Sequence, residues 1–229
     1  MNARKIQYGV IPPQANGEFV AQMEKVLDTY ALAYNPAAPV LTMDEQPMQL
    51  LKETRCPIPA TATHPKRVDY EYERAGTASI FMFAEPLSGW RDVQVRARRT
   101  KVDWALEMGQ LLENRYPSAQ RVILVCDNLN THTMGAFYEA FDAERARALV
   151  RRLEFCYTPK HGSWLNIAEN ELSSMTRQCL KDRRFGDIAE LAAATNAWAI
   201  HNNTNQRGVD WQFRISDARM KLKSLYPKI

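Results

Sequence analysis

Three acidic side chains stand where this sequence pattern could bring them together. Asp127 directly follows a run of five apolar residues, 122–126, and Asp44 follows a similar short apolar run. Glu169 lies within a helical pattern. Short apolar runs rich in β-branched residues predict buried strands, and open α/β sheets bind ligands at the carboxyl ends of such strands. Asp127 alone could simply cap a turn, but the recurrence at Asp44 favours a shared site.

Carboxylates gathered in this way have a characteristic chemistry. Two adjacent carboxylates repel each other, and their pKa values rise unless a cation holds them together. Mg²⁺ prefers oxygen ligands and keeps positions for water and phosphate. Two such ions, about 4 Å apart, can clamp the attacking and leaving oxygens of a phosphoryl displacement. Glu169 would be the third ligand and Glu171 is its rival. The two lie roughly 200° apart around a helix, so only one can face the metal, and spacing alone leaves that choice open.

The remaining patterns predict the elements that position these acids. Strands are expected at residues 39–44, 70–74, 78–84, 90–98, 122–126 and 153–157. Helices are expected at residues 17–34, 100–116, 134–152, 163–181, 187–201 and 216–226. A hairpin unit followed by alternating helices and strands predicts an α/β fold. This order resembles the ribonuclease H-like fold, a mixed five-stranded sheet flanked by helices, in which Asp44 and Asp127 would end neighbouring parallel strands.

Composition narrows the class of protein. The chain has 229 residues and a formal net charge of +4, which suits one large domain and permits a nucleic-acid partner. No apolar run approaches the about 20 residues of a membrane span, and the N-terminus lacks the apolar region of a secretion signal. The four cysteines are scattered, which favours reduced residues in a cytosolic protein over disulfides or a zinc site.

Two motifs resemble the DDE transposases of bacterial insertion sequences in the Tc/mariner superfamily. They are Leu-Val-Cys-Asp127-Asn128-Leu-Asn-Thr-His132 and Tyr157-Thr-Pro-Lys-His161-Gly-Ser-Trp-Leu-Asn166-Ile-Ala-Glu169. That family has Asp-Asn-x-x-x-His after its fourth strand and a Leu-Asn-Pro-x-Glu type segment before its last catalytic helix. Its first acid often stands as Asp-Glu, as in Asp44-Glu45. Residues 69–74, 85–91 and 217–222 also resemble one insertion-sequence branch, the IS-six-thirty branch, so the resemblance covers about residues 10–227.

The resemblance implies a catalytic triad and a reaction. Asp44, Asp127 and Glu169 would hold two Mg²⁺ ions, with Mn²⁺ as a substitute. The reaction would be cleavage of transposon ends, followed by attack of the freed 3′-hydroxyl on target DNA. The partners would be DNA and a second copy of the chain in a synaptic homodimer, in the bacterial cytoplasm at the nucleoid. Relatives carry an N-terminal helix-turn-helix region, and this chain begins nearly at the catalytic domain, so that region or a separate partner is expected to supply site recognition.

Other residues are expected to support this site. His132 is expected to bind a phosphate or orient Asp127, and Asn128 to support Asp127 or simply form the turn. Glu45 belongs to the Asp44-Glu45 pair. Lys160, His161 and Asn166 either contact the scissile strand or lie in a solvated loop. Two basic stretches, 91–101 and 177–184, are solvated faces or salt-sensitive phosphate contacts. The DNA-binding candidates are Arg98, Arg99, Lys101, Lys160, Arg177 and Lys181.

The expected organisation has three parts, and two rival functions stay open. Residues 1–36 are predicted to be a linker and helix, 37–205 the catalytic domain, and 206–229 an extension with a short helix. One rival is a ribonuclease H-like nuclease that cleaves DNA without joining ends. The other is a truncated, non-catalytic regulator of transposition. A nucleotide-binding protein is disfavoured because no Gly-rich phosphate loop follows any strand.

Overall fold

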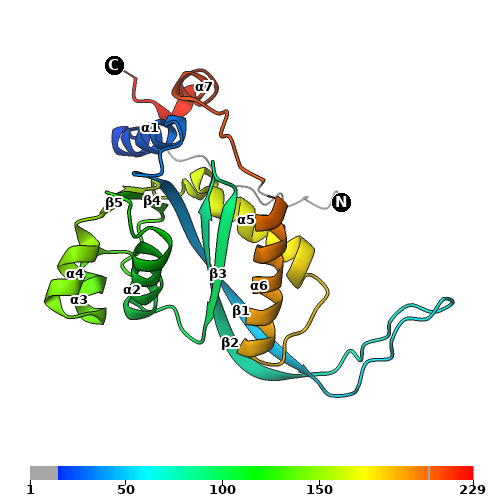
Figure 1. Cartoon of the computed structure of the whole chain (residues 1–229). Coiled ribbons are helices and arrows are strands. Elements are labelled where there is room, and N and C mark those ends of the chain that lie inside the picture. Colours follow the sequence, from blue (N-terminus) through cyan, green and yellow to red (C-terminus); the bar gives the residue numbers. More distant parts are fainter. Residues whose placement is uncertain (1–14, 206, 229) are drawn as a thin grey trace, which may run out of the picture.

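A five-stranded mixed sheet forms the centre of the structure, a computed structural model that describes residues 15–205 and 207–228. The strand order is β3-β2-β1-β4-β5. β1 pairs in antiparallel fashion with β2 and in parallel with β4 (Figure 1). The strands are β1 (Val40–Glu53), β2 (Tyr72–Glu85), β3 (Trp90–Arg96), β4 (Val122–Cys126) and β5 (Leu153–Tyr157). The prediction of a mixed sheet with parallel neighbours at β1 and β4 is therefore confirmed.

Helices cover both faces of this sheet (Figure 1). One face packs against α2 (Lys101–Gln110), α3 (Met134–Ala140) and α4 (Ala143–Val150). The other packs against α5 (Ile167–Met175) and α6 (Ile188–Asn205) and, over β4 and β5, against α1 (Gly17–Ala31) and α7 (Ile215–Lys221). Single-turn 3₁₀ segments occupy Ser163–Leu165 and Lys223–Leu225, and π turns occupy Leu111–Arg115 and Thr176–Leu180.

Local sequence explains several of these boundaries. All five residues of β4 are buried, as a strand covered by helices on both faces requires. Asn16 caps α1, and Thr100 forms a capping box with Asp103 that starts α2, as predicted. The predicted helix 134–152 is wrong in one respect, because it divides into α3 and α4. Phe141 is extended there, and the side chain of Asp142 caps α4 by accepting a hydrogen bond from the Arg145 amide.

The first two strands are longer than predicted. β1 does not end at Asp44 but continues to Glu53, and the two strands predicted at 70–74 and 78–84 form the single strand β2. Gly76, with φ +99°, lies in β2 opposite a register shift in β1, so it bends the strand instead of ending it. β4 pairs only with residues 40–42, so the free edge of β1 accommodates Pro47. Residues 54–71 extend beyond these strands as an arm (Figure 1).

Two further expectations concern the chain as a whole. Among the described residues, no helix combines the length and apolar character that a membrane crossing needs. Cys126, Cys156 and Cys179 are buried, whereas Cys56 is exposed. The predicted N-terminal linker lies outside the described residues except for its last part, 15–16, which directly precedes α1.

Candidate active site

The strand register brings Asp44 and Asp127 to the same edge of the sheet. Thr42 of β1 pairs in parallel with Val125 of β4, and each acid lies two residues further along its strand direction. Side chains two residues apart on a strand point to the same face. Both acids therefore face the side of the sheet that α5 covers.

Glu169 approaches these two acids from the first turn of α5. Burial raises the pKa of Asp44, a hydrogen bond from the Glu45 amide lowers it, and the charges of Asp127 and Glu169 raise it further, to about 6. The electrostatic effect of Asp127 and Glu169 on Asp44 indicates that the three carboxylates share one region. A pKa raised by neighbouring acids shows carboxylates that repel one another, and such clusters are typical of functional sites.

Glu171 has a different partner, which separates it from Glu169. Arg91, at the start of β3, donates from Nε to Glu171 Oε2 at 2.5 Å and from Nη2 to Oε1 at 2.9 Å. Both side chains are buried, and Arg91 also donates to the carbonyls of Gly89 and Arg207. A carboxylate held on both oxygens by a buried guanidinium is a structural ion pair. In this structure Glu169 is therefore the helix acid left to face Asp44.

His132 lies behind Asp127 on the opposite face of the sheet from α5. Its Nε2 is 3.1 Å from Glu45 Oε1, and its ring is 5.4 Å from that of Trp104. Its Nδ1 lies 2.7 Å from Asp127 Oδ1, but the N–H bond is not directed at that oxygen. Burial lowers the pKa of His132, yet contacts with Asp127, Cys126 and Glu45 outweigh this effect and raise it to about 11. The imidazolium thus lies between Glu45, the neighbour of Asp44, and Asp127.

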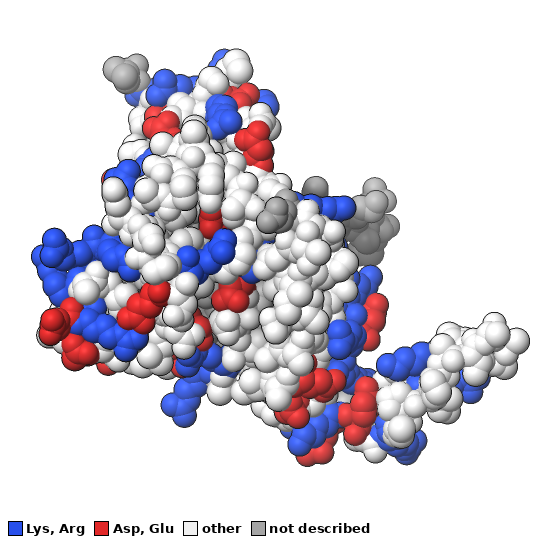
Figure 2. Space-filling model, in the orientation of Figure 1, with Lys and Arg blue, Asp and Glu red and all other residues white. Residues whose placement is uncertain are grey.

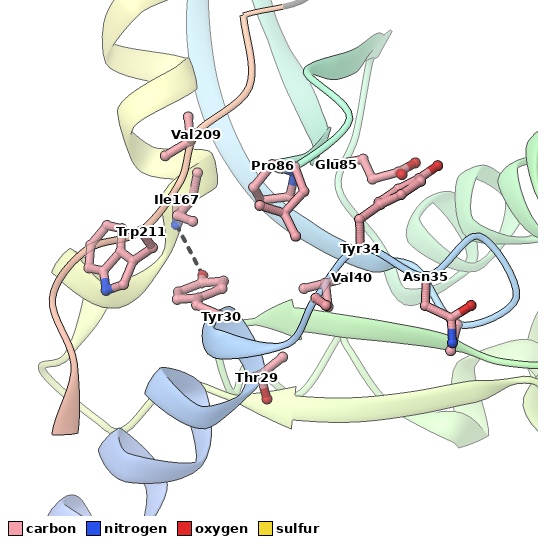
Figure 3. Close-up of a pocket in the computed structure, with 13 residues that line it drawn as sticks. Thr29, Tyr30, Tyr34, Asn35, Val40, Glu85, Pro86, Ile167, Val209 and Trp211 are labelled. Carbon is pink, nitrogen blue, oxygen red and sulfur yellow. Dashed lines mark hydrogen bonds between the residues drawn. The ribbon is translucent and has the colours of Figure 1, made fainter.

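The start of α5 is tied to β1 and α1. Asn166 caps α5 by accepting from the Ala168 amide at 3.1 Å and donates from Nδ2 to the Met43 carbonyl at 2.9 Å. Tyr30 of α1 donates to the Leu165 carbonyl and accepts from the Ile167 amide, the bond dashed in Figure 3. Asn166 is buried, so the expected contact of this residue with DNA or solvent is corrected.

The three carboxylates are the type of ligand that a hard divalent cation prefers, although their side chains do not meet at one point in this structure. Among the described residues, no three His, Cys, Asp or Glu side chains meet closely enough to hold a metal ion as they stand. The side chain of Asp127 is nevertheless 38% exposed on the side away from His132, and the three acids offer only oxygen atoms. Oxygen donors of this kind are those that Mg²⁺ and Mn²⁺ prefer. The residues present therefore fit Mg²⁺ or Mn²⁺ by donor type.

The matched family covers this whole site. A family model described as DDE superfamily endonuclease matches residues 39–192, which is more than half of the chain and includes all three acids. The chain belongs to the DDE superfamily endonucleases. A comparison with curated proteins found no match to this endonuclease.

Solved structures similar to this DDE endonuclease come from the Mos1 mariner transposase. Its catalytic domain matches with a TM-score of 0.58 and 13% identity, covering 96% of this chain and 100% of that one. The Mos1 paired end complex with Mn matches with a TM-score of 0.56 and 15% identity, covering 98% and 67%. The Mos1 strand transfer complex gives 0.55 and 15%, covering 97% and 66%. The endonuclease thus spans about two thirds of those longer chains, and the likeness confirms the ribonuclease H-like fold.

The predicted DNA-binding residues of the endonuclease lie in different surroundings. Lys101 pairs with Glu139 at 3.1 Å. In the basic stretch 91–101, Arg91 is buried and Arg96 pairs with Glu107, so neither belongs to a solvated face or a DNA surface as expected. Basic and acidic side chains lie together near the edges of the face shown in Figure 2, and much of its middle carries neither. The exposed candidates are Arg98, Arg99, Lys160, Arg177 and Lys181, and Asn128 and His161 are also exposed.

Sequence reasoning missed two sets of contacts that fix α5. The basic stretch 91–101 predicts an exposed Arg91, but Arg91 is buried. The apolar neighbours of Glu171 in α5 were the one sequence signal that the side chain of Glu171 is buried as well. Tyr30 lies in the buried face of α1, and nothing local to it indicates a bond to Leu165, 135 residues away in the segment that leads into α5. The expected helix 163–181 also begins too early, because α5 starts at Ile167 and Asn166 caps it.

Proposed function

We propose that this endonuclease is the catalytic domain of a DNA transposase that cleaves transposon ends and joins the freed 3′-hydroxyl to target DNA. The observation that carries the proposal is the parallel pairing of Thr42 with Val125. Because of this pairing, Asp44 and Asp127 follow neighbouring strands on the side of the sheet that α5 covers. Membership of the DDE superfamily endonucleases supports the reaction class. The catalytic unit is taken as residues 37–205.

Asp44, Asp127 and Glu169 are the proposed ligands of two Mg²⁺ ions, with Mn²⁺ as a substitute. Bound metal would supply an activated water and charge stabilisation for in-line phosphoryl displacement. The similar Mos1 paired end complex was solved with Mn, which supports this choice of ion. Glu169 is partly exposed in the first turn of α5 and, among the described residues, makes no ion pair like that of Glu171.

Neighbouring residues hold these ligands in place. His132 presents a positive charge to the back of Asp127 and is itself fixed by Glu45, so it limits the rotation of the Asp127 carboxylate. Arg91 and Glu171 fix the rotational phase of α5, and Asn166 fixes its distance from β1. These contacts fix the two strands and the helix that carry the proposed ligands, which limits the movement that the ligands need in order to bind a cation.

The proposed partners are transposon ends, target DNA and a second copy of the chain. Mos1 structures include a paired end complex and a strand transfer complex, which supports DNA partners and a synaptic dimer. We place the protein in the bacterial cytoplasm, acting at the nucleoid, within the IS-six-thirty branch of insertion sequences. Recognition of the ends is assigned to a helix-turn-helix region or to a separate partner protein.

The test is cleavage and joining of a pre-nicked DNA end in the presence of Mg²⁺, Mn²⁺ or EDTA. The wild-type chain is expected to join the end to target DNA with either metal and to be inactive in EDTA. Asp127→Asn is expected to fold normally and to lose activity by about a thousand-fold or more, because a proposed metal ligand is lost.

Other outcomes of this assay identify the two rivals. Metal-dependent cleavage without joining would indicate a ribonuclease H-like nuclease. A folded chain with no activity on the pre-nicked end would indicate a non-catalytic regulator of transposition. Cleavage that persists in Asp127→Asn would remove the assignment of the triad.

A further inference from the structure

A cleft of about 610 Å³ opens directly beside Asp127. Asp127 and Asn128 form the end nearest the acids, and the loop that joins β5 to α5 forms one wall through Lys160 and His161. The first turns of α1 form the opposite wall. Asp127 belongs both to this cleft and to the acid cluster, so the cleft adjoins the proposed position of the scissile phosphodiester.

The loop wall is a tight turn with an unusual residue in it. The Gly162 amide donates to the Pro159 carbonyl at 2.8 Å, which closes a four-residue turn. His161 is the third residue of that turn and has φ +65°, a left-handed conformation that favours glycine. Gly162 is required, since an added Cβ would meet Pro159 Cγ at 2.6 Å. A side chain kept at such a position has a free-energy cost, and costs of this kind concentrate at functional sites.

The two walls of the cleft carry different chemistry. Lys160 and His161 are exposed and provide a cation and an imidazole, which suit a phosphate. On the α1 wall, Gln22 Nε2 donates to Glu18 Oε1 at 2.8 Å, which leaves the remaining carboxylate and amide oxygens as acceptors for a base edge. Leu129, which is 43% exposed, adds an apolar surface on which a base can pack.

We propose that this cleft binds one unpaired nucleotide of the DNA strand that adjoins the scissile phosphate. The proposal rests on the proposed function, because the phosphodiester at Asp127 leads the strand into the cleft. A duplex is far too wide for a space of this volume, whereas a nucleotide displaced from its stack fits one. The phosphate of that nucleotide lies against Lys160 and His161, and its base lies against the α1 wall and Leu129.

The test compares two labelled DNA ends in EDTA, where no cleavage occurs. One end is a nicked duplex with the nucleotide beside the scissile phosphate unpaired, and the other is the same duplex fully paired. Fluorescence anisotropy is expected to show that the wild-type chain binds the unpaired end about five-fold or more tightly. His161→Asn keeps a residue that tolerates the left-handed turn and is expected to abolish this preference, whereas His64→Asn, at an exposed histidine on the arm, is expected to keep it.

Lys160→Ala gives a second, independent measurement. The slope of the logarithm of affinity against the logarithm of salt concentration is expected to fall by about 0.7 for the unpaired end, the value for one phosphate contact on a single strand. Lys66→Ala, at another exposed lysine, is expected to leave the slope unchanged. An unchanged preference in His161→Asn together with an unchanged slope in Lys160→Ala would overturn the proposal.

The outcome separates this inference from the proposed function. If the chain joins DNA ends but shows no preference for the unpaired nucleotide, the transposase function stands and the proposed nucleotide-binding role of the cleft is wrong. If the chain prefers the unpaired nucleotide through His161 but never cleaves DNA, the cleft is a nucleotide-binding site and the proposed transposase function is wrong.

Discussion

Asp44 has the most informative ionisation among the three acids, because its pKa is raised on folding. Its carboxylate lies on a buried strand, and burial together with the charges of Asp127 and Glu169 raises its pKa to about 6. An acid with a pKa raised on folding binds its proton more tightly in the folded state than in the unfolded chain. Its ionisation therefore lowers the free energy of unfolding as the pH rises from about 4 to about 6, and the loss persists at higher pH.

Asp44→Asn is accordingly expected to stabilise the metal-free protein. At pH 8 in EDTA the gain should be about 1–2 kcal/mol, after allowance for the partial exposure of the site. At pH 4, where the wild-type carboxyl is protonated, the difference between the two proteins should nearly vanish. Urea unfolding at both pH values measures this difference. Equal stabilities at pH 8, or a less stable variant, would contradict the account of repelling carboxylates.

The sequence was informative about these acids to different degrees. Asp44 and Asp127 each follow a short apolar run, so their place at one end of neighbouring strands could be predicted. The choice between Glu169 and Glu171 could not be made from spacing, because it depends on Arg91, which lies 80 residues away from Glu171. Pairing over such a separation leaves no local pattern in the chain.

At the scale of elements, the position of α5 depends on a few polar contacts at its first turn. Asn166 both caps the helix and bonds to the carbonyl of Met43, the residue before Asp44. Tyr30 holds the segment just before the helix. These bonds place the helix start, and with it Glu169, relative to β1. The cap and the link to β1 are separate functions of one side chain.

Two substitutions at Asn166 should separate the cap from the link. Asn166→Ser keeps a capping hydroxyl but cannot reach Met43, whereas Asn166→Ala loses both contacts. We expect Asn166→Ala to lower the free energy of unfolding by about 1 kcal/mol more than Asn166→Ser. Both should reduce DNA cleavage by a similar factor of about ten, because both release α5 from β1. Thermal unfolding and cleavage assays measure the two effects, and full activity in either folded variant would contradict the link.

Element boundaries show where local patterns are insufficient. The capping box at Thr100 and the five buried residues of β4 were predictable because the determining residues are adjacent in sequence. β1 and β2 were predicted too short, because Pro47 and Gly76 usually end strands. Both are tolerated here at the free edge of β1 and at a bulge, which are features of the assembled sheet and not of the local sequence.

At the scale of the whole molecule, both ends of the described chain pack on the same face of the sheet. Residues 207–228 run back over α1, where Trp211 packs on Tyr30 at 5.4 Å between ring centroids (Figure 3). Arg219 and Tyr226 bond to Glu24 of α1, and these bonds lower the pKa of Glu24 despite the opposing effect of burial. The segment assigned as an extension thus covers part of the apolar core.

Removal of residues 206–229 is therefore expected to destabilise the catalytic unit. Loss of the packing of Trp211, Ala218 and Leu225 should lower the free energy of unfolding by about 3 kcal/mol or more. Arg219→Ala removes only an exposed, solvent-screened ion pair and should leave the free energy of unfolding nearly unchanged. Denaturant unfolding of the two variants compares the stability lost with the apolar packing of the segment with the stability lost with its ion pair to Glu24. A truncated protein as stable as the full chain would show that this segment is dispensable for the core.

The most direct test of the proposed active site is metal-dependent cleavage by two matched variants. Glu169→Gln removes a proposed ligand, and Glu154→Gln makes the same chemical change on a side chain that is 45% exposed and pairs with Arg121 at the surface. Both variants and the wild-type chain are assayed on a pre-nicked DNA end with Mg²⁺, Mn²⁺ and EDTA. We predict metal-dependent activity in the wild type and Glu154→Gln, and a loss of about a hundred-fold or more in Glu169→Gln. Equal activity in all three proteins, or activity that persists in EDTA, would contradict the account.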